Sequence, residues 1–182
     1  MEMLNSIKNQ LPLNTDLVSL RLFTRTDISE QYIGWLNDMD VVQYSNQKFI
    51  KHTTESCINF FDGFENSPSL FIAIEDALSD IVIGTLTIHC SRPHNTADVG
   101  ILLGNKDYWG KGYAKQAWCS VVDLLSNVIN IRKVTAGTLA CNLPMIGLMK
   151  ASDMKLDGIR AGQELVDGQP MDIVYYARFF TL

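Results

Sequence analysis

The sequence predicts an α/β fold of the α+β kind, in which one mixed sheet is packed by helices. Two kinds of segment alternate along its 182 residues: short runs rich in β-branched and aromatic residues, and longer runs with apolar residues three and four positions apart. This alternation excludes all-helical and all-β folds. Because 47% of the residues are apolar, 19% are charged and no repeat or linker occurs, we expect a single domain over residues 1–182.

Local signals predict each element in turn. Runs typical of strands occupy residues 18–23, 70–74, 81–89, 97–104 and 133–139. Runs with helical periodicity occupy residues 28–36, 54–63, 112–128 and 144–152. Asp27, followed three residues later by Glu30, predicts a capping box for the first helix, and Thr53 predicts the N-cap of the second.

The tail is predicted to be a hairpin that turns at Asp167-Gly168, a dipeptide typical of tight hairpin turns. Gln169-Pro170 follows at once and favours a loop longer than two residues. The runs at 70–74 and 81–89 are expected to be adjacent antiparallel strands. The sheet is therefore mixed, with antiparallel neighbours at its start and end.

Charge and cysteine usage exclude several function classes. The chain has 15 Lys+Arg against 20 Asp+Glu, a net charge of −5, without a basic cluster, so we expect neither nucleic-acid nor membrane binding. The start of the chain shows no secretory signal. The cysteines are far apart and lack metal-ligand spacing, which predicts reduced thiols, a cytoplasmic protein and no metal. They are Cys57, Cys90, Cys119 and Cys141.

A strand that runs into a glycine loop and then into the strongest predicted helix forms an anion site around residues 99–114. Amides of the loop and first helical turn lack intrahelical partners, and the helix dipole adds positive charge there. Gly110 and Gly112 let the main chain approach a phosphate closely. Neither a P-loop nor a dinucleotide fingerprint fits, because Lys111 is followed by Gly112 and position 115 is Lys.

The segment Asp107-Tyr-Trp-Gly110-Lys-Gly112-Tyr-Ala resembles the pyrophosphate-binding segment of the GNAT superfamily of N-acetyltransferases, (Gln/Arg)-x-x-Gly-x-(Gly/Ala), in its RimJ/RimL-like form. The similarity covers nearly the whole chain, including Leu20-Arg-Leu, Trp35-Leu-Asn-Asp, Asp98-Val-Gly and Asp167-Gly. It implies a GNAT-like, mostly antiparallel sheet with splayed central strands. Two positions depart from the pattern, since Asp107 replaces Gln or Arg and Met145 stands where relatives have Ser after Asn142.

The resemblance implies acetyl-CoA as cosubstrate. The family's pantetheine arm pairs with backbone of the splayed strand, here Ile101, Leu102 and Leu103, and with an asparagine, here Asn142. A broken ladder leaves N–H and C=O groups that require a partner, which fits this role. The pyrophosphate is implied to bind the amides of Tyr108, Trp109, Gly110, Lys111, Gly112, Tyr113 and Ala114.

The resemblance also implies direct attack of a neutral amine on the thioester, with Asp98 as the base or as the residue that holds a water. The alternative is that Asp98 is a solvent-exposed hydrogen-bond acceptor at a turn, without a catalytic role. A backbone N–H near Leu102 or Leu103 is expected to meet the oxyanion. The tyrosine that protonates the thiolate in relatives is absent after Asn142, which leaves Ser152, Cys141 or a water.

The expected reaction is transfer of an acetyl group to a primary amine. The RimJ/RimL resemblance favours a protein N-terminus, such as that of a ribosomal protein; a small amine, an amino sugar, or CoA binding without catalysis are the alternatives. In relatives the acceptor side is lined by the loop that here carries Tyr44, Ser45, Lys48 and Phe49. Among the histidines, His89 lies at the end of a predicted strand, where it can face the acceptor cleft or have a structural role. The oligomeric state is either monomer or homodimer.

Overall fold

The strands of the chain lie in one sheet of order β1-β2-β3-β4-β5-β6-β8-β7, in a computed structural model that describes residues 2–65, 67–127 and 129–180. All neighbouring strands are antiparallel except β5 and β6, which are parallel. The strands are β1 (Leu13–Asn14), β2 (Val18–Leu22), β3 (Ser69–Asp76), β4 (Val82–Ser91), β5 (Thr96–Leu103), β6 (Lys133–Leu139), β7 (Lys155–Val166) and β8 (Gln169–Phe179).

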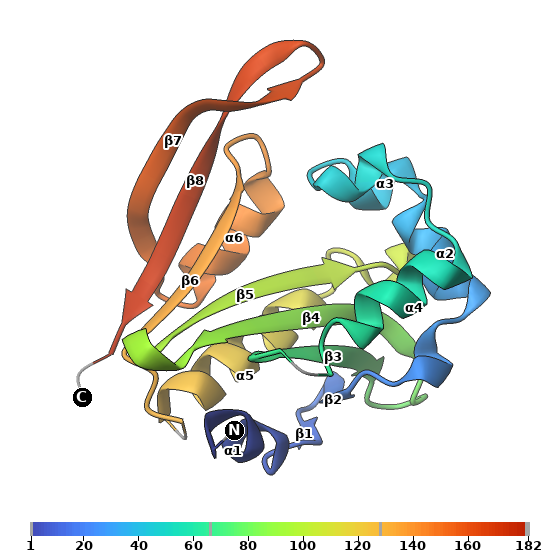
Figure 1. Cartoon of the computed structure of the whole chain (residues 1–182), viewed down its shortest axis with the longest axis vertical. Coiled ribbons are helices and arrows are strands. Elements are labelled where there is room, and N and C mark those ends of the chain that lie inside the picture. Colours follow the sequence, from blue (N-terminus) through green and yellow to red (C-terminus); the bar gives the residue numbers. More distant parts are fainter. Residues whose placement is uncertain (1, 66, 128, 181–182) are drawn as a thin grey trace.

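Helices cover the first five strands on both faces (Figure 1). They are α1 (Glu2–Lys8), α2 (Glu30–Leu36), α3 (Met39–Val42), α4 (Thr54–Asp62), α5 (Tyr113–Asn127) and α6 (Leu143–Ala151). The long α5 packs on one face, while α2 and α4 pack on the other. The β7–β8 hairpin extends away from this body (Figure 1), and Glu164 of β7 accepts a 3.2 Å hydrogen bond from Asn46, in the segment that follows α3.

Strand β3 shows why the sheet is buried on both faces. Its side chains alternate, with Leu70 and Ile72 in the core under α5, and Phe71 and Ala73 in the core under α2 and α4. A strand has a side-chain period of two, so a continuous apolar run supplies both cores at once. Trp118 of α5 is fully buried in the first core.

The predicted strands and helices are confirmed in kind and order, with boundaries shifted by a few residues. In the predicted helix 112–128, residue 128 lies outside the described residues. Three further short elements, α1, β1 and α3, were not predicted, because they have only two to seven residues and weak periodicity.

Two local predictions are wrong. The N-cap of α2 is Ser29, whose side chain accepts from the Tyr32 N–H, whereas Asp27 accepts two hydrogen bonds from Arg21 at 2.7 and 2.8 Å. The carboxylate that the sequence assigned to the cap of α2 is thus used by the Arg21 pair and by the Thr24 N–H, which donates to it at 2.7 Å.

The closing hairpin has a two-residue turn and not the longer loop expected. Asp167 and Gly168 have φ of +50° and +77°, and Val166 pairs directly with Gln169. Positive φ at both turn residues matches the twist of a hairpin.

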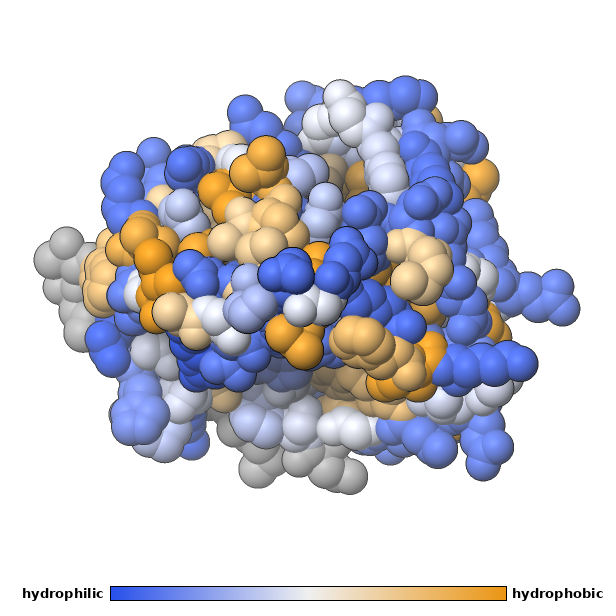
Figure 2. Space-filling model, turned by 90° about the horizontal axis from the view of Figure 1, so that it is seen from above, coloured by the Kyte–Doolittle hydropathy of each residue, from blue (hydrophilic) through white to orange (hydrophobic). Residues whose placement is uncertain are grey.

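None of the described helices is long and apolar enough to cross a membrane. Seen from above, the surface is largely polar, with apolar side chains in separate groups between polar ones (Figure 2). In the part of the chain that the structure describes, no three His, Cys, Asp or Glu side chains come together as a metal site.

Candidate active site

The central strands β5 and β6 separate. In the described strands their ladder has only three pairs, of which the last joins Asp98 to Thr135, while β5 continues to Leu103. The Gly104 N–H donates to a β4 carbonyl at 3.0 Å, so the alternation of peptide groups turns those of Leu103 toward the separated side. There the Leu103 carbonyl accepts a 2.7 Å hydrogen bond from the Trp109 indole. The outer half of β5 thus lacks β6 as its backbone partner.

The glycine loop leads directly from this half-paired strand into α5. Gly110 and Gly112 have φ of +71° and +91°, conformations that residues with a side chain rarely adopt. A Cβ at Gly110 would meet nothing within 4 Å, and one at Gly112 only Leu17 Cδ1 at 3.7 Å. Backbone shape, and not crowding, therefore requires glycine at both positions.

The start of α5 is suited to an anion. Its first turn contains Lys115 and, among these described residues, no acidic side chain. The amides at the start of a helix have no intrahelical partners, and the helix dipole favours negative charge there. The loop and the first turn of α5 can therefore hold a phosphate group.

Two tyrosines fix the base of this loop to β3. The rings of Tyr108 and Tyr113 meet edge to face with centroids 4.8 Å apart, and both hydroxyls donate to the Asp76 carboxylate at 3.4 Å. Asp76 also accepts from the Ser79 hydroxyl at 2.6 Å, and this bond is the main reason why its pKa is lowered. The carboxylate stays charged and holds the loop in place.

A cavity of about 270 Å³ lies between the glycine loop and α6. It is lined by Leu103, Tyr108, Gly110, Gly112, Ala114, Lys115, Pro144, Gly147, Leu148 and Ala151. The end of β5, the loop and the first turn of α5 thus share one hollow. Its backbone donors, lysine and apolar wall fit a phosphate-bearing group with an apolar arm, such as CoA.

Asp98 lies on the other side of the β5–β6 separation, in the wall of a second cavity of about 250 Å³ that also contains Glu164 and Tyr175. Its side chain reaches solvent, but the protein around it raises its pKa by desolvation. A 2.6 Å hydrogen bond from Thr135 Oγ1 and the charge of His89 oppose this rise. Asp98 therefore combines access with a carboxylate that accepts protons more readily than usual.

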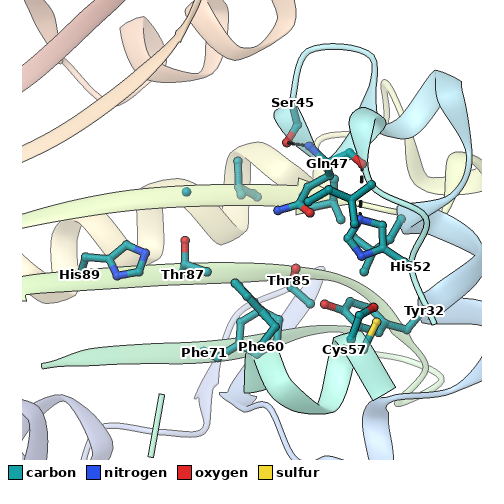
Figure 3. Close-up of a pocket in the computed structure, with 16 residues that line it drawn as sticks. Tyr32, Ser45, Gln47, His52, Cys57, Phe60, Phe71, Thr85, Thr87 and His89 are labelled. Atoms are coloured by element: carbon teal, nitrogen blue, oxygen red, sulfur yellow. Dashed lines mark hydrogen bonds between the residues drawn. The ribbon is translucent and has the colours of Figure 1, made fainter. Parts of the chain in front are cut away.

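The largest cavity, about 530 Å³, is a cleft between the helices α2 and α4 and the strands β3 to β5. Figure 3 shows His52, Tyr32 and Thr85 on its walls and Phe60 and Phe71 along its lower side. Ile101 and Leu102 of β5 also line it. One strand, β5, therefore borders this cleft, the cavity of the glycine loop and the cavity of Asp98.

This arrangement agrees with the comparison of the sequence with protein-family models. Residues 18–155 match the model of the acetyltransferase (GNAT) domain, which is more than half of the chain. The chain belongs to the GNAT family.

Two bacterial relatives show a distant likeness to this chain. The uncharacterized N-acetyltransferase p20 of Bacillus licheniformis is 27% identical over 100 residues, which span 54% of this chain and 56% of that relative. The GNAT-family acetyltransferase of Bacillus anthracis superposes with a TM-score of 0.76 at 20% identity, over 92% of this chain and 97% of that one.

Two further structures share the GNAT fold. The Vibrio cholerae spermidine N-acetyltransferase in complex with CoA and spermine has a TM-score of 0.79 at 16% identity, over 91% and 96% of the chains. RimL, a ribosomal alpha-N-protein acetyltransferase in complex with CoA, has a TM-score of 0.81 at 15% identity, over 93% and 97%. At these identities the likeness establishes the fold.

The cofactor residues predicted from the sequence of this GNAT protein do not all line one cavity. Leu103, Tyr108, Gly110, Gly112 and Ala114 line the loop cavity, and Ile101 and Leu102 line the large cleft. The Trp109 indole bonds to Leu103, the Tyr113 hydroxyl bonds to Asp76, and Lys111 is exposed. Asn142 caps α6: its Oδ1 accepts from the Met145 N–H at 3.2 Å, and its Nδ2 donates to Thr138 at 3.0 Å.

The general-acid candidates of this GNAT chain differ in accessibility. Ser152 is buried, accepts from the Trp118 indole at 2.9 Å and donates to the Met149 carbonyl at 2.9 Å, so both of its hydrogen-bonding roles are structural. Cys141, between β6 and α6, is half-buried. Helix α6 contains no tyrosine. Of the two side chains that the sequence offers for protonating a thiolate, Cys141 is the more accessible.

The predicted acceptor loop splits between surfaces. Ser45 lines the large cleft, and Tyr44 lines the cavity of Asp98. Lys48 and Phe49 instead border a fourth hollow, where Phe49 is 72% exposed.

Sequence reasoning missed the polar groups inside the large cleft. Tyr32 falls in the predicted helix 28–36, among its apolar positions, and Thr85 and Thr87 fall in the predicted strand 81–89. Residues two apart in a strand share a face, and this spacing was the signal that could have placed both threonines on one side of the sheet. His52 and His89 both line the cleft, whereas His94 is exposed in a turn away from it.

Proposed function

We propose that this GNAT protein is an N-acetyltransferase that transfers the acetyl group of acetyl-CoA to a primary amine. The observation that carries the proposal is the separation of β5 from β6 directly before a positive-φ glycine loop and the start of α5. This leaves backbone groups of β5 for an amide-bearing arm and loop amides for a pyrophosphate. The CoA-bound relatives with the same fold support the same ligand.

Two residues of the chain have separate roles in the proposed reaction: Leu103 stabilises the oxyanion and Asp98 accepts the proton. When bound, acetyl-CoA supplies the activated acetyl group. The Leu103 N–H, which faces the separated side, stabilises negative charge on the thioester oxygen. Asp98, whose pKa is raised by desolvation, takes the proton of the incoming amine directly or through a water, and Thr135 orients its carboxylate.

The acceptor amine is a protein N-terminus or a small molecule. The likeness to RimL supports the former, and the likeness to the spermidine N-acetyltransferase supports the latter.

Titration calorimetry with acetyl-CoA tests the cofactor site. Gly112→Glu places a carboxylate against the pyrophosphate and is expected to lose measurable affinity. Gly168→Glu is the matched control, because Gly168 also has positive φ (+77°) with no atom within 4 Å of its Cβ position, but lies in the hairpin turn. Equal affinity of the two variants would show that the loop does not hold the pyrophosphate.

Release of CoA, followed with a thiol reagent over a panel of amines, tests the activity. Asp98→Asn should keep acetyl-CoA affinity and lower turnover by about 10²- to 10⁴-fold, the usual contribution of a general base. A specific observation favours an alternative, CoA binding without catalysis, since α6 lacks a tyrosine. Acetyl-CoA binding without CoA release for any amine would establish that alternative.

A further inference from the structure

Among the described residues, the lining of the large cleft lacks carboxylates and contains the imidazoles of His52 and His89. Its sixteen lining residues, all within the described chain, include no Asp, Glu, Lys or Arg. Aromatic rings of Phe60, Phe71 and Tyr32 form one side (Figure 3), and Phe71 and Tyr32 are in ring contact with centroids 6.4 Å apart. A cavity of this kind stabilises apolar groups and leaves a second charge on a ligand without a counter-ion.

Two hydroxyls of largely buried residues open onto this cleft. Tyr32 and Thr85 are only 4% and 5% exposed as residues, and the structure shows no hydrogen bond from either hydroxyl to another described residue. Among the described residues no fully buried side-chain oxygen lacks a partner, so both hydroxyl oxygens are accessible from the cleft. Burial raises the pKa of Tyr32, so its hydroxyl stays protonated and can donate. The two groups are therefore positioned for a neutral polar atom of a ligand.

From these observations we infer the acceptor class, an inference that rests on the proposed acetyl transfer. The acceptor is a primary amine whose remaining skeleton is apolar or aromatic, carries no second charge, and presents one neutral hydrogen-bonding group to Tyr32 and Thr85. Polyamines are poor acceptors, because a second ammonium in this cleft would meet no carboxylate among the described lining residues, and attraction to the aromatic rings replaces only part of the hydration that it loses.

The cleft opens toward β5 at Gly100, Ile101 and Leu102, next to the half-paired backbone. The acceptor skeleton then lies over Phe60 and Phe71 while its amine points to β5. Asp98 is on the same face of the sheet as His89, its pairing partner on β4, which also lines the cleft. Asp98 thus serves the proton of the reacting amine, and none of the described residues that line the cleft offers a carboxylate to a distant charge.

Matched amines test this class by both CoA release and calorimetric binding. Hexylamine and 1,6-diaminohexane differ in the second charge, and tyramine and 2-phenylethylamine differ in one hydroxyl. We expect kcat/KM for hexylamine to exceed that for the diamine at least tenfold, and tyramine to bind more tightly than 2-phenylethylamine. Equal or better use of the diamine would overturn the inference.

Two variants locate the effect. Phe60→Asp adds a carboxylate at a partly exposed position of the cleft and should reverse the preference toward the diamine, whereas Phe60→Leu should keep it. Tyr32→Phe should remove the advantage of tyramine over 2-phenylethylamine. If the variants leave all preferences unchanged, the amines bind elsewhere and the inference is wrong.

Binding separates this inference from the proposed function. If no amine releases CoA but hexylamine binds, and Phe60→Asp weakens that binding, the cleft assignment holds and the enzyme proposal fails. If CoA is released from the diamine as readily as from hexylamine, the enzyme proposal holds and the acceptor class fails. Absence of any amine binding overturns the acceptor class.

Discussion

Replacing Gly112 by alanine probes whether the glycine loop is held in its shape before any ligand binds. Gly112 has φ of +91°, and a Cβ there would make only an ordinary contact with Leu17 Cδ1 at 3.7 Å. The substitution therefore adds backbone strain without a steric clash. Gly34, exposed within α2 and with no atom within 4 Å of its Cβ position, offers the same chemical change in a helical backbone.

The two substitutions should change the free energy of unfolding in opposite directions. Left-handed backbone costs a residue with a side chain about 1–2 kcal/mol, and the stiffer unfolded chain returns about 0.4–1 kcal/mol. Gly112→Ala should therefore lose about 1 kcal/mol of stability. Gly34→Ala should gain about 0.5–1 kcal/mol, because alanine favours the helix interior.

Urea denaturation and thermal unfolding measure the difference. The variants should differ by about 2 kcal/mol, which for a domain of this size separates their Tm values by about 4–8 °C. Their m-values should be equal, since the same surface is exposed on unfolding. If Gly112→Ala is as stable as the unmodified chain, the loop does not hold Gly112 at positive φ, and the argument for a preformed phosphate site fails.

Three further predictions concern polar groups that the tertiary structure pairs. Arg21→Met should lower stability by about 1.5–3 kcal/mol at neutral pH, because it removes the charged hydrogen bonds to Asp27. Burial raises the pKa of Asp27, but hydrogen bonds from Arg21 and Thr24 lower it overall. The pair's contribution to stability should therefore be lost as pH falls below the ordinary carboxyl range. In urea denaturation, a change from neutral to acid pH should lower the stability of Arg21→Met less than that of the unmodified chain. Ser152→Ala should cost about 1–3 kcal/mol in denaturation, because it leaves a buried indole N–H unpaired, while turnover of the folded protein should persist; loss of turnover at unchanged stability would make Ser152 a catalytic acid. Thr135→Val should raise the pKa of Asp98 further and move the acid limb of the kcat/KM profile to higher pH, and an unmoved limb would separate that limb from Asp98.

Much of the secondary structure could be predicted from local sequence. The run at 70–74 and the repeat in 112–128 are strong signals, since period and residue type agree over several turns or pairs. Short elements such as α3, with four residues, were missed because they depend on neighbours that local sequence does not reveal. Asp27 was misassigned for a different reason: it caps the short turn that precedes α2 and pairs with Arg21 of β2, and the local pattern did not distinguish these roles from an N-cap of α2.

The candidate site divides in the same way. The glycine loop is continuous in the chain, so its residues and the start of α5 could be recognised together. The cleft combines α2, α4 and three strands, and no local pattern indicates that the Tyr32 hydroxyl faces it. The position of Lys48 and Phe49 in a separate hollow follows from the path of a loop, which the sequence does not encode by periodicity.

The sequence by itself determined the order of the longer strands and helices, the position of the glycine loop and the family resemblance, because each depends on residues close together in the chain. Only the tertiary structure decided at which pair β5 leaves β6, that Glu164 shares a cavity with Asp98, and that the described lining of the large cleft lacks a carboxylate. These features arise from contacts between distant segments, whose register and loop paths are set by packing the whole chain.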